Sequence, residues 1–386
     1  MCRRFNSDFA HLKFDPPGGN GLPEGSFLFG ACWPLVRILG IESSCDETGV
    51  AIVDDGWRVV CNCVLSQVPI HQRFGGVVPE IASRAHVEAI TRMVEAALGE
   101  AGIPVPPPPG ALSAIAVAHR PGLVGSLLVG VTAAKCLAWA WGIPLVAVDH
   151  LSAHIHAACM TAEAAAGQRL PVDDLYPAVS MVVSGGHSAL YLSEGWTAHR
   201  RIGSTNDDAV GEAFDKAAAV LGLGYPGGPA ISRIAETGNP RAFQFRRTLF
   251  DSDSLDFSFS GIKTAVLYAA KGQNASRLAP LRAGVKLRDL AASFQEAVVD
   301  VLIEKLRRAL RREGLSRALI GGGVACNRRL RERLADLAKK EEIVVFYPEP
   351  KLCTDNGAMI AGLGAHLFEE GARSDLSLDA DPVAVG

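Results

Sequence analysis

Two histidines with three residues between them, His150 and His154, follow directly after the apolar run 145–148. If the run is a buried strand and a helix begins behind it, both imidazoles lie on one face of that helix. This spacing offers two nitrogen ligands to one metal ion. It also suits two packing histidines near a helix start, so the pair alone does not decide between a metal site and a core contact.

An internal repeat runs through the chain, because three kinds of segment occur twice in the same order. Each half reads as an apolar hairpin with a hydroxyl-bearing tip, then a strand with a Gly-rich helix entry, then a strand followed by a helix. The segments are 38–54, 114–135 and 145–158 in the first half, and 178–192, 318–334 and 343–367 in the second. Two matched halves predict a duplicated α/β fold of two lobes with a central cleft, where ligands bind at the carboxyl ends of strands.

The repeat supplies a third candidate ligand for the histidine pair. The second-half position that corresponds to His150 and His154 holds Thr354, Asp355 and Asn356. If the halves face each other around a pseudo-twofold axis, Asp355 points at the histidines. Two histidines and one carboxylate form a recognised divalent-metal set with open positions. This arrangement makes the metal interpretation about as probable as the packing interpretation.

Both hairpin tips carry residues that could bind or activate a substrate. Asp46 and Glu47 lie at the first tip, and the sequence SGGHS (184–188) forms the second. A small-hydroxyl turn between buried strands can present N–H and O–H groups to a phosphate or an acyl group. An ordinary hairpin turn has a similar composition, but two adjacent carboxylates at such a tip are less common.

An acidic helix face is predicted in the segment 207–229. Asp208, Glu212 and Asp215 recur at helical spacing. Like charges stacked in this way repel each other modestly. The face is therefore either solvated or directed at a partner such as Lys216, ribose hydroxyls or metal-bound water.

A basic cluster is the one local feature that could contact RNA. Its lysines and arginines are residues 305, 307, 308, 311, 312, 317, 328, 329, 331 and 333. A solvated helix face is the simpler interpretation, and a phosphate-backbone footprint is the alternative. The net charge of −3 excludes a global basic field.

Composition and flanking segments indicate a cytoplasmic protein of ordinary globular type. Nine cysteines without a C-x-x-C pair are typical of a reducing compartment. No secretory signal and no 18-residue apolar run is evident, so no membrane span is expected. The predicted division is a disordered extension 1–35, a first lobe 36–158, an exposed insertion 159–176, a second lobe 177–369 with a helical insertion at about 203–270, and a flexible tail 370–386.

Eight stretches together resemble the TsaD family of bacterial tRNA threonylcarbamoyladenosine synthases, formerly labelled O-sialoglycoprotein endopeptidases. The stretches are GIESSCDETGVAI (40–52), GGVVPEIASRAHVE (75–88), DHLSAHIHA (149–157), VSGGHSAL (183–190), DDAVGEAFDKAAAVLGLGYPGGP (207–229), FSFSGIKTA (257–265), GGGVACNRRLR (321–331) and CTDNGAMIA (353–361). The resemblance covers about residues 36–365 and implies the duplicated fold of actin, Hsp70 and the sugar kinases. Residues 1–35 and 160–175 depart from the family pattern.

The resemblance implies roles for residues in every one of the candidate groups above. His150, His154 and Asp355 would hold a divalent metal ion, usually Fe²⁺, with Zn²⁺ or Mg²⁺ possible in vitro. Asp46 and Glu47 match acidic tip residues needed for activity. The residues that would contact the acyl-adenylate are Val182, Val183, Ser184, Gly185, Gly186, Asp215, Gly228 and Asn327.

The implied reaction is the transfer of a threonylcarbamoyl group from threonylcarbamoyl-AMP to the N6 amine of adenosine 37, in tRNAs that read codons beginning with adenine. Because the donor is already activated, catalysis requires positioning and charge stabilisation more than a strong nucleophile. Asp46 or Glu47 could take the proton of the attacking amine. The family works with TsaB, an inactive relative of the same fold, and with TsaE, a small P-loop ATPase.

Three other classes of protein are weighed against this interpretation. A metalloprotease would need the glutamate of H-E-x-x-H, and residue 151 is leucine. A sugar or acetate kinase shares the fold but has no use for a fixed His/His/Asp metal set. A non-catalytic ATP-binding scaffold would tolerate changes at Asp46 and Glu47.

Overall fold

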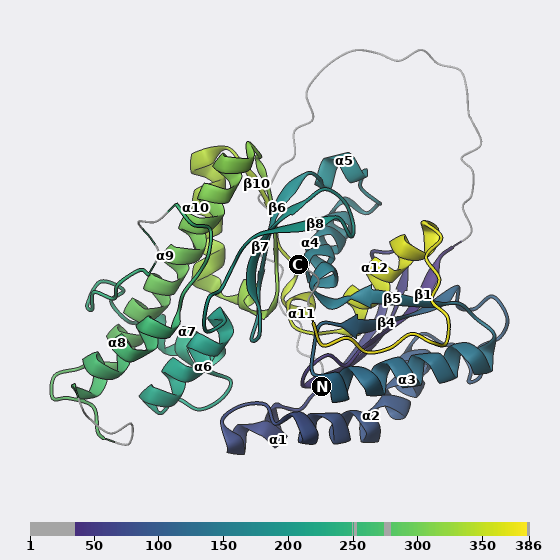
Figure 1. Cartoon of the computed structure of the whole chain (residues 1–386), viewed down its shortest axis with the longest axis horizontal. Helices are drawn as coiled ribbons and strands as arrows, with labels where there is room; N and C mark the ends of the chain where they lie inside the picture. The colour runs from purple at the N-terminus through teal and green to yellow at the C-terminus, as the bar shows by residue number, and fades with distance from the viewer. Residues whose placement is uncertain (1–34, 249, 251–252, 274–278, 384–386) are drawn as a thin grey trace, which may run out of the picture. The chain divides into compact units, whose positions relative to one another are not determined.

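The structure is a computed structural model, and it describes residues 35–248, 250, 253–273 and 279–383. Apart from Leu35, the predicted N-terminal extension lies outside the described residues. Two five-stranded mixed sheets form the framework (Figure 1). The strands are β1 (Arg37–Glu42), β2 (Glu47–Asp54), β3 (Arg58–Ser66), β4 (Ala114–Arg120) and β5 (Leu145–Asp149) in the first sheet, and β6 (Ala178–Val183), β7 (Ser188–Ser193), β8 (His199–Ser204), β9 (Arg317–Gly321) and β10 (Val344–Phe346) in the second.

The two sheets have the same topology, which confirms the internal repeat. The first has the strand order β3-β2-β1-β4-β5 and the second β8-β7-β6-β9-β10. In each, three antiparallel strands are followed by two parallel ones. The third strand of each half, β3 or β8, is not apparent in the sequence pattern.

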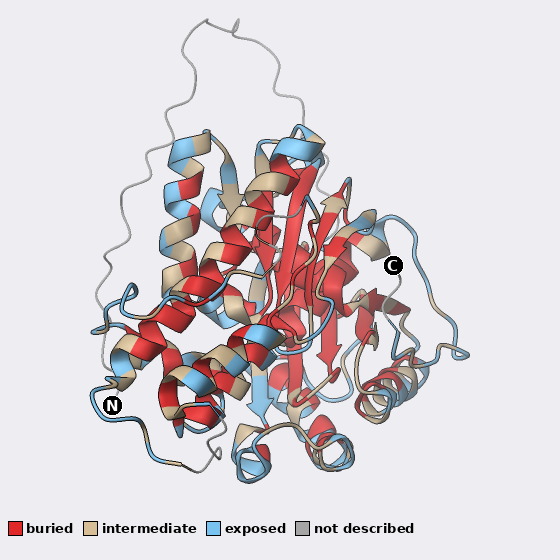
Figure 2. Cartoon of the chain, turned by 60° about the vertical axis from the view of Figure 1, so that its left-hand side comes forward, coloured by how far each residue is buried: buried red, intermediate tan, exposed pale blue. Residues whose placement is uncertain are grey.

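The central strands are buried along nearly their whole length, as the red ribbon in Figure 2 shows. Helices cover both faces of these sheets, so the central strands read as continuous apolar runs rather than as alternating ones. The helices are α1 (Val68–His71), α2 (Pro79–Glu100), α3 (Val124–Trp141), α4 (His150–Ala166), α5 (Val172–Leu175), α6 (Val210–Leu221), α7 (Gly227–Ala235), α8 (Ser260–Lys271), α9 (Leu287–Glu313), α10 (Arg328–Glu341), α11 (Pro350–Cys353) and α12 (Gly357–Glu369), with short 3-10 turns η1 (Gln72–Phe74) and η2 (Gly323–Cys326).

The helices α4 and α12 are exchanged between the two halves. The first-half helix α4 packs on β9 and β6 of the second sheet, whereas the second-half helix α12 packs on β1, β2 and β4 of the first. Glycines permit the close approach of α12, since a Cβ on Gly49 would lie 2.6 Å from the backbone nitrogen of Gly357. The two helices also pack against each other. The beginnings of both helices are thereby held between the sheets.

Two predicted boundaries differ from the structure. The interval 159–176 is not an exposed insertion throughout, because α4 continues to Ala166 and buries Met160 and Glu163. Exposure is confined mainly to residues 164–174. The alanines of this stretch are good helix formers, and the helix continues to Ala166, about two turns beyond the predicted boundary at residue 158.

The C-terminal segment 370–383 is held against the first sheet rather than being a free tail. The backbone nitrogen of Ser374 donates to the carbonyl of Leu145 at 2.8 Å, and that of Asp381 donates to His119 at 2.9 Å. The bond to Leu145, together with the bond that the nitrogen of Ala147 donates to Oγ of Ser374 at 3.1 Å, covers part of the outer edge of β5, and the bond to His119 holds the segment at the end of β4. The edge strand supplies the physical reason for order in a polar segment that has no periodic apolar pattern.

One helix in the described part of the chain, α3, is long and apolar enough to cross a membrane by length and composition alone. The sequence reading had expected no such segment. The helix packs on β4 and α2 as a core helix does, and only 33% of it is buried.

Candidate metal centre and active site

His150, His154 and Asp355 meet in space although 201 residues separate the last two. The Nε2 atom of His154 lies 3.1 Å from Oδ1 of Asp355, and Nε2 of His150 lies 3.6 Å from the same oxygen. One possible ligand atom from each of the three residues lies within 4.8 Å of the other two. The structure therefore brings together the set that the internal repeat predicted.

Helix caps place these three side chains. Asp149 accepts a hydrogen bond from the nitrogen of Ser152 at 2.9 Å, which starts α4 at His150. Asn356 caps α12 in the same way through Met359 at 3.1 Å, so that Asp355 stands immediately before that helix. The two histidines thus lie at the start of a helix that directly follows β5, whereas Asp355 lies in the short link between α11 and α12.

A small residue in the second sheet allows α4 to come close enough. A Cβ on Gly321, at the end of β9, would overlap the carbonyl group of His154. Any other residue at this position would push the second histidine away from Asp355. The glycine run 321–323 therefore has a packing reason here, in addition to any role at a ligand.

The donor set fits a divalent first-row metal ion. Such ions hold nitrogen and oxygen donors at about 2.0–2.2 Å, which places the donors roughly 3–4 Å from one another. Within the described ranges, Asp355 forms its ion pairs with the two histidines and none with a lysine or arginine. A carboxylate that retains only 17% exposure needs positive charge nearby, and a cation between the three groups would supply it.

Glu42, which the sequence reading missed, orients the first histidine. Its Oε2 atom lies 2.9 Å from Nδ1 of His150, and the Oγ atom of Ser44 lies 3.2 Å from the same nitrogen. Burial opposes protonation, but the carboxylates of Glu42 and Asp355 overcome it and raise the pKa of His150 to about 9 in the metal-free protein. With Nδ1 engaged by Glu42, Nε2 is directed to the metal position.

The first hairpin tip places Asp46 and Glu47 near Asp355. Burial, and then the charges of Asp355 and Asp46, raise the pKa of Glu47 to about 9, and a hydrogen bond joins Glu47 to Asp46. Glu47 therefore keeps its proton at neutral pH. His86 braces the tip, because its Nδ1 lies 2.7 Å from Oγ1 of Thr48 and its Nε2 lies 3.0 Å from the carbonyl of Cys45.

The second hairpin tip forms a tight turn beside the histidines. The nitrogen of Ser184 donates to the carbonyl of His187 at 2.8 Å, and the Ser184 hydroxyl accepts from the nitrogen of His187 at 3.1 Å. Gly185 and Gly186 have open space around them. Burial, and then His150 and His154, lower the pKa of His187 to about 4, so this imidazole is neutral.

Val182 and Val183 end strand β6 with fully buried side chains. Neither residue exposes surface, backbone included, so the two valines shape the tip from beneath. A ligand at this tip would meet residues 184–186, of which Gly185 and Gly186 are exposed.

Asp215 lies on α6 and ties that helix to the next one. Its Oδ1 atom accepts from the nitrogen of Gly227 at 2.6 Å, and burial raises its pKa to about 6 against that hydrogen bond. Lys216 bridges Asp208 at 2.5 Å and Glu212 at 2.8 Å. The acidic face thus has a lysine partner for two of its three carboxylates, as one of the predicted alternatives required. Gly228, next in the chain, leaves open space for a ligand.

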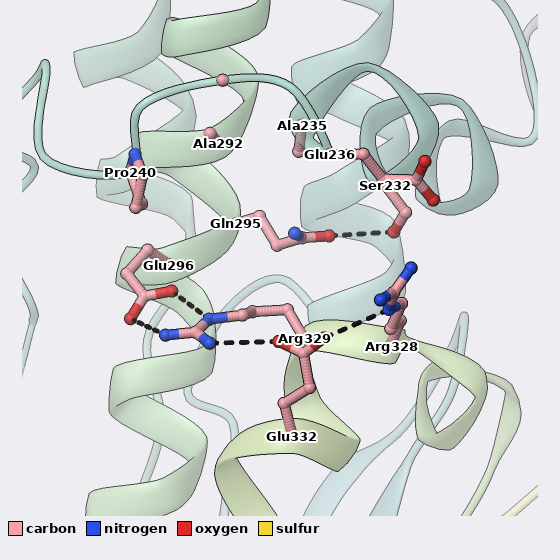
Figure 3. Close-up of a pocket in the computed structure, with 11 residues that line it drawn as sticks. Ser232, Ala235, Glu236, Pro240, Ala292, Gln295, Glu296, Arg328, Arg329 and Glu332 are labelled. Atoms are coloured by element: carbon pink, nitrogen blue, oxygen red, sulfur yellow. Dashed lines mark hydrogen bonds and ion pairs between the residues drawn. The ribbon is translucent and has the colours of Figure 1, made fainter.

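A pocket of about 300 Å³ (Figure 3) adjoins the start of α10. Asn327 is the N-cap residue of that helix. Its Oδ1 atom caps the helix through Leu330 at 3.0 Å, and its Nδ2 atom donates to Ser232 and Gln295, both at 2.9 Å. Ser232 and Gln295, which also bond to each other at 2.9 Å, line the pocket and were missed in the sequence. The apolar periodicity of α7 and α9 does not indicate that these two polar residues line a pocket.

Most of the basic cluster is neutralised by carboxylates. Glu304 pairs with Arg307 and Arg308, Glu341 with Arg311, and Glu296 with Arg329 and Arg333 at distances between 2.6 and 2.7 Å. An ion-pair network between α9 and α10 therefore accounts for much of the charge. The count of basic residues in the sequence overstated the positive surface available to RNA.

Comparisons with known proteins agree with this geometry. The family model described as TsaD, tRNA N6-adenosine threonylcarbamoyltransferase, matches residues 58–362. A protein of that name from Anaeromyxobacter sp. (strain Fw109-5) is 49% identical over 348 residues, 90% of this chain and 99% of the relative. A second from Syntrophotalea carbinolica is 48% identical, covering 89% of this chain and 95% of the relative.

Among solved structures, full-length HypF in its phosphate- and nucleotide-bound form matches with a TM-score of 0.54 at 14% identity, covering 88% of this chain and 47% of that one. At this identity the match concerns the fold alone. It confirms the duplicated architecture of the actin, Hsp70 and sugar-kinase type.

Proposed function

The chain belongs to the TsaD family of tRNA N6-adenosine threonylcarbamoyltransferases, and on that premise we propose how its residues carry out the transfer. The family forms N6-threonylcarbamoyladenosine in tRNA. The convergence of His150, His154 and Asp355 from opposite halves carries the proposal. The metalloprotease motif lacks its glutamate, since residue 151 is leucine, and a kinase has no need of this donor set.

We assign the acyl donor, threonylcarbamoyl-AMP, to the space between the second tip and the pocket beside Asn327. Gly185, Gly186 and Gly228 leave room for backbone to approach the ligand. The buried carboxyl of Asp215 adds an acceptor for a hydroxyl group. The pocket of about 300 Å³ then receives the adenosine portion.

The two carboxyl groups of the first tip, Asp46 and Glu47, have different roles in proton transfer. Glu47, whose pKa is about 9, keeps its proton and hydrogen bonds to Asp46. Asp46 is the carboxylate that accepts a proton from the N6 amine of adenosine 37 as that nitrogen bonds to the acyl carbon. AMP leaves with the electron pair of the anhydride bond, so the charge lost at Asp46 reappears on the leaving group.

Two imidazoles and one carboxylate favour Fe²⁺ or Zn²⁺ over Mg²⁺, which prefers oxygen donors. Of these we propose Fe²⁺. When bound, the ion supplies Lewis-acid polarisation of the donor's oxygens. Glu42 fixes the His150 ring for that purpose, and Gly321 permits the position of His154.

The decisive test measures modified nucleoside and metal content together. Cells depleted of the protein are rescued with wild type, Asp355→Ala or His150→Ala, and tRNA nucleosides are quantified by mass spectrometry. Loss of threonylcarbamoyladenosine in both variants, with loss of bound metal in the purified proteins, is the expected result. Normal modified tRNA with Asp355→Ala would rule out the metal assignment.

An exposed apolar stripe on α3 supports a protein partner of the same fold, which we identify as TsaB, with TsaE joining that assembly. Val124, Leu128 and Trp139 are 55%, 49% and 75% exposed and fall on one face of the helix. Leu128→Glu should abolish co-purification with the partner while leaving the fold intact. Val172→Glu, an exposed apolar residue on α5, serves as the matched control.

The substrate tRNA and the free thiols of all the described cysteines support a cytoplasmic location. Fractionation of cells with an antibody against the chain tests this. A signal in the soluble cytoplasmic fraction is the expected outcome.

A further inference from the structure

Two thiols lie side by side between the metal centre and the pocket. Cys326 ends the turn η2 and is exposed, whereas Cys353 ends α11 and is buried. Both sulfurs face one short segment: Sγ of Cys326 donates to the carbonyl of Pro350 at 3.5 Å, and Sγ of Cys353 to that of Glu349 at 3.4 Å. Because Glu349 and Pro350 are adjacent in the chain, these two bonds bring the thiol groups close to each other.

Arg331 fixes the surroundings of this pair. Its Nε donates to the carbonyl of Ala325 at 2.6 Å, and its Nη2 donates to Pro348 at 2.8 Å and to Sγ of Cys353 at 3.3 Å. The guanidinium lies over the ring of Tyr347, 4.7 Å from its centroid. One arginine therefore holds both segments that carry the thiols.

Cys326 is the reactive member of the pair. The hydrogen bond from Cys353, and further the charge of Arg331, lower the pKa of Cys326 to about 7 against the opposing effect of burial. An accessible thiol with this pKa is substantially ionised at neutral pH, and it has a second thiol in reach.

We propose that Cys326 and Cys353 form a reversible disulfide when the protein meets a low-molecular-weight disulfide such as oxidised glutathione. The Cys326 thiolate attacks one sulfur of the reagent, and a glutathione thiolate leaves. The Cys353 sulfur then attacks Sγ of Cys326, the second glutathione leaves, and it takes the proton of Cys353. Two protein thiols are oxidised and one oxidised glutathione is reduced to two thiols.

The disulfide acts on the site through its neighbours in the chain. Cys326 directly precedes Asn327, and Cys353 lies two residues before Asp355. Hydrogen-bonded sulfurs must approach to about 2.05 Å to form the bond, which draws η2 and α11 together by about an ångström or more. Resting on the proposed function, this shift lowers acyl transfer by up to about 100-fold, and a reducing agent restores it.

The other described cysteines provide a control. Cys136 is exposed on α3, so it reacts with the same reagents but lies on a different element. Cys61 and Cys63 lie two positions apart on β3, so both face the core of the first lobe, and neither lies on the elements that carry Cys326 and Cys353. Cys136→Ser therefore changes the number of accessible thiols without touching the pair.

The test treats the full chain with oxidised glutathione and digests it without reduction. A cross-link between the tryptic peptides 318–328 and 352–373, present in wild type and Cys136→Ser and absent in Cys326→Ser, is expected. In Cys353→Ser, Cys326 should instead accumulate as a glutathione adduct. A wild-type protein in which Cys353 still alkylates after denaturation would overturn the proposal. This readout needs no activity, so it is independent of the assigned function; the activity arm compares oxidised and dithiothreitol-treated protein.

Discussion

Glu42 and His150, 108 residues apart, are joined by a buried contact of 2.9 Å between Oε2 and Nδ1. The carboxylate fixes which ring nitrogen faces the metal position. Glu42→Gln keeps the shape but removes the charge, and metal affinity should fall by about 10–100-fold. Competition titration against a chelating dye measures it. Ser44→Ala, which leaves Glu42 in place, should weaken binding less; equal affinities in Glu42→Gln and wild type would contradict the assigned role.

A methyl group at Gly321 should damage the metal centre through the backbone of α4. Because the added Cβ overlaps the carbonyl of His154, Gly321→Ala should reduce the free energy of unfolding by about 1–3 kcal/mol and weaken metal binding. Thermal unfolding and the same dye titration measure both. Gly323→Ala is the control, since its Cβ would meet only a methyl group of Thr354 at 3.7 Å. Equal losses in the two variants would remove the steric explanation.

The proton on Glu47 should make the metal-free protein less stable as the pH rises. Burial raises the pKa of this carboxyl to about 9, so between pH 4.5 and 9 the folded state holds a proton that the unfolded chain releases. Glu47→Gln removes this difference. Its advantage in unfolding free energy over wild type should therefore grow from pH 5 to pH 8, as urea unfolding would reveal. A constant difference would mean that Glu47 is ionised.

Acid should destabilise the protein through His156, a histidine of α4 outside the active site. Burial lowers the pKa of His156 to about 4. Between pH 6.5 and pH 4, the unfolded chain therefore binds a proton that the folded state does not bind. Between pH 7 and pH 4 this single group removes roughly 3 kcal/mol of stability. His156→Gln should flatten the pH dependence of urea unfolding over that range. An unchanged slope would place the acid sensitivity elsewhere, for example at His366, whose pKa is also lowered by burial.

Asp46 and Glu47 should differ in their effect on the reaction although they are adjacent. Asp46→Asn removes the proposed proton acceptor and should lower the transfer rate by about 10²–10⁴-fold. Glu47→Gln, which resembles the protonated form, should retain most of the activity at pH 7. Single-turnover assays with purified tRNA and acyl donor compare them. The opposite order of losses would exchange the two roles.

Much of the fold and the metal set could be predicted because both depend on chain order. The apolar runs and helix starts occur in the same order in both halves of the chain. That repeat alone predicts that Asp355 lies opposite His150. Glu42 could not be found in this way, since it reads as the last residue of an apolar strand. Its partner becomes visible only when β1 and α4 are packed.

The neutralisation of the basic cluster could not be predicted for a related reason. A count of charges between residues 304 and 333 leaves out Glu296 on α9 and Glu341 on α10. These two carboxylates neutralise several arginines of the cluster. The same holds for the polar segment 370–383, for which the sequence predicts a flexible tail. Its composition does not indicate the edge strand to which it hydrogen bonds.

The exchange of α4 and α12 has a consequence for biosynthesis. The face of the first sheet that α12 covers is complete in sequence by residue 149, yet its cover is synthesised only with residues 357–369. During synthesis, the apolar faces of β1, β2 and β4 remain uncovered and accessible to chaperones until some 200 further residues have been made. Neither half can mature alone, so the enzyme becomes both folded and metal-competent at a single late moment of its synthesis.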